Sequence, residues 1–108
     1  MALDAELRLY SVDDLATELM ERGLDMTEQE VLAWLREHGY LISLHGPRYN
    51  APSQLCLEYG LMHERQLATA CGRGRLFVEH SPLLTRPGHE FIMPRLIRYA
   101  TSRQQNKP

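Results

Sequence analysis

The fold is decided by residues 10–44, which read YSVDDLATELMERGLDMTEQEVLAWLREHGYLISL. The pattern predicts a helix, a tight turn, a second helix and then a short strand. Ser11 caps the first helix, and Asp13 and Asp14 put negative charge in its first turn, where the helix dipole favours it. Gly23 ends this helix, because glycine takes the left-handed conformation at little cost.

The second helix begins with a capping-box spacing, in which Thr27 is followed three residues later by Glu30, and it ends at Gly39. Both helices carry apolar residues at three- and four-residue steps, which makes each of them amphipathic. These residues are Val12, Leu15, Ala16, Leu19 and Met20, then Val31, Leu32, Trp34 and Leu35. Two helices joined so briefly must pack at a steep angle, as in a helix-turn-helix unit.

A β-wing is predicted directly after the second helix. Residues 40–44 form a short β-type run, and the turn residues of 45–47 follow it. Arg48 and Tyr49 then lead the chain back to the body of the domain. A helix-turn-helix unit with a wing indicates a small winged-helix-like domain of the α+β class.

The second half of the chain completes the domain. We expect a short helix over 53–59, an extended segment over 61–67 and a flexible loop over 68–75. We expect a strand over 76–78, a turn at 81–82 and a partner strand at 83–84. A final helix begins at Thr85, and Pro94 kinks or restarts it. Its apolar face is predicted to hold Phe91, Ile92, Leu96 and Tyr99, whereas His89 is expected to lie on the surface.

Length and composition indicate one domain over 1–108, with a lead-in segment over 1–10 and a frayed tail over 104–108. No apolar run approaches the ~18 residues of a membrane helix, and the start of the chain lacks a signal sequence. These features predict a soluble protein of the cytoplasm. Cys56 and Cys71 are expected to be reduced, and no cysteine or histidine has metal-ligand spacing, so we expect neither metal nor cofactor.

The net charge of −2 conceals an asymmetry. Residues 1–46 hold ten acidic residues against three arginines, whereas residues 47–108 hold nine basic against four acidic residues. Such a split is typical of an electrostatic partner surface, although charged helix faces also serve simply to meet water.

Three stretches give the chain a resemblance to the KilAC domain found at the C-terminus of phage antirepressor proteins. The helical pair and the GYL that follows it match the family's L-x-x-x-G-(Y/I)-L pattern. NAPSQLCLEYGLM, from residue 50, matches a segment with proline and glycine eight residues apart. LLTRPGHEFIMPRL, from residue 83, matches T-x-x-G-x-x-(Y/F)-I. The resemblance covers about residues 10–96.

The resemblance implies a phage or prophage regulator in a bacterial host, with a DNA-binding helical domain and a small β element. In the family this domain usually follows an N-terminal domain. The chain is accordingly expected to be either a stand-alone version or an excised C-terminal domain.

An enzyme is not expected, because the sequence holds no nucleophile elbow, no phosphate-binding glycine loop and no paired carboxylates beside a histidine. The first hypothesis is DNA binding, acting on transcription. The second helix, the wing and the basic loop would supply the contacts, from Thr27, Gln29, Ala33, Arg36, Arg48, Tyr49, Arg73 and Arg75. Arg86, Arg95 and Arg98 could add to them, whereas Glu28, Glu30 and Glu37 would repel DNA from the second helix.

The alternative hypothesis is a protein-interaction module that inactivates a repressor or another regulator. An acidic helical face could occupy the basic DNA-reading surface of such a partner. The residues for this are Asp14, Glu18, Glu21, Glu28 and Glu30. Trp34 is expected in the core, and Leu3, Leu7 and Leu9 are candidates for a homodimer contact.

Overall fold

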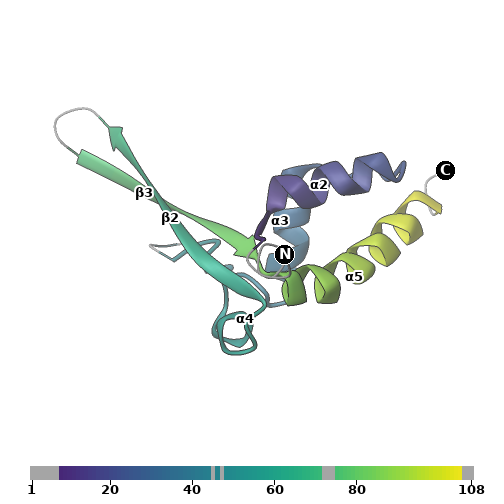
Figure 1. Ribbon diagram of the computed structural model, residues 1–108. Coiled ribbons are helices and arrows are strands. Elements are labelled where there is room, and N and C mark those ends of the chain that lie inside the picture. The colour runs from purple at the N-terminus through teal and green to yellow at the C-terminus, as the bar shows by residue number, and fades with distance from the viewer. Residues whose placement is uncertain (1–7, 45, 47, 72–74, 106–108) are drawn as a thin grey trace.

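The computed structural model describes residues 8–44, 46, 48–71 and 75–105, with the backbone alone over 66–71 and 75–79. In order, the elements are β1 (Tyr10–Ser11), α2 (Val12–Glu21), α3 (Glu28–Glu37), α4 (Gln54–Glu58), β2 (Met62–Cys71), β3 (Arg75–Leu84) and α5 (Arg86–Gln105). The fold is α+β and winged-helix-like, as the sequence predicts. In Figure 1 a long β-hairpin projects away from a body of helices, and α5 runs along that body in the other direction.

The helical pair forms where the sequence places it, because local caps determine both starts. Ser11 and Asp14 form one reciprocal capping box, and Thr27 and Glu30 form the other. Gly23 has φ +77°, and the next amide turns back to the Leu19 carbonyl at 2.9 Å, which closes the first helix. In Figure 1 α2 and α3 cross steeply.

The apolar stripes of the helices meet the base of the hairpin in one core. Four side chains at its centre are fully covered, namely Leu15, Leu35, Met62 and Leu96. The predicted stripes are confirmed with three exceptions. Met20 is 60% exposed, and Phe91 and Tyr99 on α5 are 37% and 38% exposed.

The sheet is antiparallel with strand order β1-β3-β2. Ten residue pairs join β2 and β3, from Met62 opposite Leu84 to Cys71 opposite Arg75, whereas β1 pairs only with Leu83 and Leu84. The hairpin therefore extends well beyond the body with no third strand beside it. This hairpin is the wing of the fold.

Several predictions for the β segments are wrong. Residues 40–44 do not form a strand of the sheet, since their contact with the returning chain is an isolated bridge between Leu41 and Pro52. Residues 68–71 and 75 belong to strands rather than to a loop, because in-register pairing outweighs the weak strand preference of alanine. Ser81 and Pro82 lie inside β3; the proline is tolerated because β1 does not reach it.

Thr85 caps the final helix as predicted, and α5 runs from Arg86 to Gln105, two residues into the expected tail. It does not restart at Pro94. Thr85 ties it to the turn before β2: its hydroxyl accepts the Gly88 amide at 3.1 Å and donates to the Gly60 carbonyl at 2.5 Å. Its own amide donates to the Leu61 carbonyl at 3.0 Å.

Candidate nucleic-acid and partner interface

The segment between α3 and α4 is fastened to α3 by Arg36. The guanidinium donates to Asn50 Oδ1 at 2.7 Å and lies over the Tyr49 ring, 5.0 Å from its centroid. Asn50 has φ +68°, a left-handed conformation that asparagine tolerates better than most residues. Arg36 and Tyr49 are therefore brought together as a structural pair, and the guanidinium is half-buried.

Arg48 joins this loop to the base of the wing. Its guanidinium lies 3.4 Å from Glu64 on β2, and the same carboxylate lies 2.8 Å from Nδ1 of His80 on β3. The His80 side chain is only 6% exposed, whereas that of Arg48 is 53% exposed. Arg48 thus lies beside the hairpin, whereas Tyr49 contacts Arg36 of α3, and the strands of the wing come from a later part of the chain than the sequence predicts.

The other predicted DNA contacts lie apart from this loop. Thr27 and Gln29 are exposed at the start of α3, and Ala33 is half-buried in its middle. Arg75 opens β3 at the distal end of the hairpin. Arg73 lies outside the described residues.

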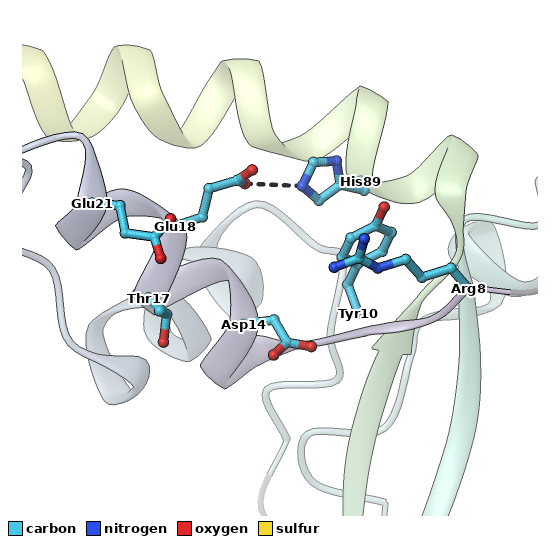
Figure 2. Close-up of a pocket in the computed structure, with 7 residues that line it drawn as sticks. All are labelled: Arg8, Tyr10, Asp14, Thr17, Glu18, Glu21 and His89. Atoms are coloured by element: carbon cyan, nitrogen blue, oxygen red, sulfur yellow. Dashed lines mark hydrogen bonds and ion pairs between the residues drawn. The ribbon is translucent and has the colours of Figure 1, made fainter. Parts of the chain in front are cut away.

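A polar groove of about 200 Å³ lies between α2, β1 and the start of α5 (Figure 2). Three of the acidic residues predicted to bind a partner line it, together with one further residue of α2 and three residues from other parts of the chain. The lining residues are Arg8, Tyr10, Asp14, Thr17, Glu18, Glu21 and His89. The three acids share one side of α2, because they are spaced by four and then three residues.

One wall of this groove is a stack of cationic and aromatic groups. Arg8 lies over the Tyr10 ring at 4.7 Å, and Tyr10 stacks on His89 with centroids 4.2 Å apart. His89 Nε2 lies 2.9 Å from Glu18 Oε2 (Figure 2). His89 is half-buried and paired, so the expectation of a plain surface histidine is wrong. Periodicity identifies the acids, but no sequence signal connects them with Arg8 or His89, which other elements supply.

The remaining two acids of the partner-binding prediction lie on α3. Glu28 is exposed, whereas Glu30 accepts the Thr27 amide at 3.1 Å and pairs with Arg103 of α5. Arg103 also donates to the Asp25 carbonyl, so it holds α5 to the start of α3. The Thr27 amide and then the Arg103 guanidinium keep the pKa of Glu30 below its ordinary value. Glu30 is therefore already engaged within the domain.

We expect Glu30→Gln to lower stability at neutral pH by about 0.2–1 kcal/mol, since the pair is partly exposed and screened by solvent. A carboxyl whose pKa is lowered by folding stabilises the fold above its unfolded pKa, and this effect is lost as pH falls through the folded pKa. In thermal melts the Glu30→Gln variant should therefore have a lower melting temperature than the wild type at neutral pH, and the difference should disappear in acid. Glu28→Gln is the matched control, and an equal deficit in that variant would contradict the assignment.

Among the described residues, no group of three or more histidine, cysteine, aspartate or glutamate side chains could hold a metal ion. The same part of the chain has no helix with the length and apolar character needed to cross a bilayer. Cys56 is buried, and this burial raises the pKa of its thiol.

Comparison with known proteins gives one match. The family model described as Phage antirepressor protein KilAC domain matches residues 4–98, which include both capped helices, the wing and most of α5. No curated protein and no solved structure matches the chain. The family match agrees with the resemblance of the three sequence stretches and covers most of the chain. The chain therefore belongs to the KilAC domain family, the domain of phage antirepressor proteins.

Proposed function

We propose that this phage regulatory domain acts on transcription by binding DNA, with the β2–β3 wing as its first contact. The observation that carries the proposal is the separation of charge between two parts of the fold. Residues 12–37, which span α2 and α3, hold eight acidic against two basic residues. Residues 62–108, which span the wing and α5, hold eight basic against three acidic residues. A polyanion is attracted to the second part and repelled by the first.

The shape of the molecule agrees with this approach. The wing projects away from the acidic helical pair (Figure 1), and Arg75 stands at its distal end. Arg65, exposed on β2, donates to Ser81 across the strands at 2.8 Å, and Arg48 lies close to the same base. Arg48, however, pairs with Glu64, which faces the opposite side of β2 from Arg65. The wing therefore offers a cationic residue near each end, Arg65 at the base and Arg75 at the tip, and a phosphate backbone can lie between them.

In this proposal α3 has a secondary role. Arg36, the cation predicted to read bases, is held by Asn50 and Tyr49 and positions the loop beside the wing. Thr27 and Gln29 remain on the surface for a groove contact, and Glu28 and Glu37 weaken any deep insertion of this helix. Phosphate contacts from the wing would then dominate affinity, with limited base readout.

A second candidate function is capture of a repressor through the polar groove. It is favoured by the convergence of Asp14, Glu18 and Glu21 on one open face, which complements a basic DNA-reading surface. In that case Asp14→Asn with Glu21→Gln should abolish binding to the basic, DNA-reading domain of a repressor.

DNA binding is tested by fluorescence anisotropy with a labelled duplex of mixed sequence, at salt concentrations from about 50 to about 200 mM. We expect binding that weakens steeply with salt. The double variant Arg65→Gln, Arg75→Gln should bind more weakly and reduce the slope of log K against log salt by about 1.8, since each lost phosphate contact removes about 0.9.

The control is Arg22→Gln, which removes a positive charge directly after α2, outside the basic part of the chain. This variant should keep the wild-type slope. Absence of binding at the lowest salt, or a loss in the control as large as that in the double variant, would contradict the proposal and leave repressor capture as the better account.

A further inference from the structure

The solvent side of α5 carries a row of arginine and aromatic residues outside the surfaces described above. Phe91, Arg95 and Arg98 share this side, since they are spaced by four and three residues, and Tyr99 lies next to them. The two rings are more than one-third exposed, and both arginines are exposed. We call these four residues the α5 ridge.

Arg95 is held in position before any partner arrives. Its guanidinium carbon lies over the Phe91 ring, 3.8 Å from the centroid, and Nη1 donates to the Phe91 carbonyl at 2.6 Å. Because both contacts are on one side of the guanidinium, its outer N–H groups remain available to donate hydrogen bonds to an anion. A fixed arginine loses less conformational entropy on binding than a free one, so this position is preorganised.

Two carboxylates on or beside α5 already form ion pairs with other residues. Glu90 pairs with Arg86 at 3.2 Å, and Glu30 pairs with Arg103. Over the described residues, neither Arg95 nor Arg98 has a carboxylate partner within salt-bridge distance.

The aromatic surface continues from the ridge onto the end of α3. Tyr40 meets Phe91 edge-on at 6.1 Å, and His38 stacks on Tyr40 at 6.4 Å. Tyr99 packs against the buried Trp34, with centroids 6.3 Å apart. Partly exposed rings beside cations without acidic partners are the combination that proteins use to bind single strands, in which bases stack on rings while arginines follow the backbone.

We infer that the α5 ridge binds single-stranded nucleic acid, with Arg95 and Arg98 on neighbouring phosphates. Unstacked bases would contact the parts of the Phe91 and Tyr99 rings that remain exposed beside the guanidinium groups of Arg95 and Arg103, which lie over them. A duplex presents the same phosphates but keeps its bases paired, so it gains nothing from the rings. An acidic peptide gains from the arginines but offers no base to stack. The inference deepens the proposed nucleic-acid role on a surface separate from the wing, so the two can fail independently.

Trp34 provides the measurement, because it is the only tryptophan of the chain and contacts His38, Tyr40 and Tyr99 beneath the surface. In the Arg65→Gln, Arg75→Gln background, which removes the proposed wing contacts, a thymine oligonucleotide of about 20 nucleotides should change the Trp34 fluorescence and bind more tightly than a duplex of equal charge. Arg95→Gln with Arg98→Gln should weaken this binding by about tenfold or more and leave duplex binding unchanged. Phe91→Leu, which keeps bulk but removes the ring, should weaken it about fivefold or more.

Arg22→Gln is the control and should bind the oligonucleotide like the wild type, while circular dichroism checks that each variant is folded. Two results would overturn the inference: wild-type binding of the oligonucleotide by the Arg95 and Arg98 double variant, or, in the Arg65→Gln, Arg75→Gln background, a duplex or polyglutamate that binds as tightly as the thymine strand. If the Arg65 and Arg75 variant loses duplex binding while the single strand still depends on Arg95 and Arg98, the wing and the ridge are separate sites.

Discussion

Gly88→Ala is expected to be among the most destabilising single substitutions in this protein, although it adds only one methyl group. The new Cβ would lie 1.8 Å from the carbonyl oxygen of Leu61 and 2.8 Å from its carbonyl carbon. Overpacking a core commonly costs about 1–3 kcal/mol and sometimes more, and a contact this short against backbone belongs at the upper end of that range.

The backbone at this contact cannot move away cheaply. The Leu61 carbonyl accepts the Thr85 amide, and the Thr85 hydroxyl bonds both the Gly60 carbonyl and the Gly88 amide. A shift of α5 away from Leu61 would break these bonds and also disturb the buried Ile92, one turn further along. The T-x-x-G of this chain is therefore a close contact between a helix start and the turn before β2.

Urea unfolding checks this expectation, with Gly23→Ala as the matched control. Gly23 has positive φ but open space around it, so that variant should lose about 1–2 kcal/mol from backbone conformation alone. Gly88→Ala should lose clearly more. If the two variants unfold at the same urea concentration, the close contact at Leu61 does not limit packing.

Trp34→Ala is expected to cost about 3–5 kcal/mol, a large fraction of the stability of a domain of this size. The indole is 4% exposed and stacks on the His38 ring, with centroids 4.2 Å apart. It also packs against the rings of Tyr40 and Tyr99. Its loss leaves a cavity where α3 meets α5. The melting temperature should fall by more than about 10 °C, as measured by circular dichroism.

Tyr59→Ala serves as the control, since that ring is 71% exposed and its removal should change stability by no more than about 0.5 kcal/mol. Trp34→Phe should recover most of the stability by filling part of the space. A Trp34→Ala variant that melts like the wild type would contradict the role of Trp34 in packing the core between α3 and α5.

The sequence predicts the first half of the fold well, because local interactions determine it. Caps at Ser11 and Thr27, and glycines at 23 and 39, act within a few residues of their own helix. The wing is different, since strand pairing depends on a partner far along the chain. Ala68, Ala70 and Pro82 are residues that rarely favour strands. Ten in-register residue pairs nevertheless place the two alanines in β2 and the proline in β3.

The candidate sites divide in the same way. Asp14, Glu18 and Glu21 are predicted to share a face because their spacing is helical, and they do line one groove. Arg8, Tyr10 and His89 complete that groove only after β1 and α5 have packed, which no local pattern reveals. The engagement of Arg36 with Asn50, and of Glu30 with Arg103, depends likewise on contacts across the fold.

The most direct test of the DNA-binding account is a titration of isotope-labelled protein with duplex DNA at low salt, followed by amide chemical shifts. The account predicts that the largest shifts fall in β2, in β3 and in the loop around Arg48, whereas the amides of α2 stay in place. Shifts confined to α2 and its groove, or no shifts at all, would contradict it.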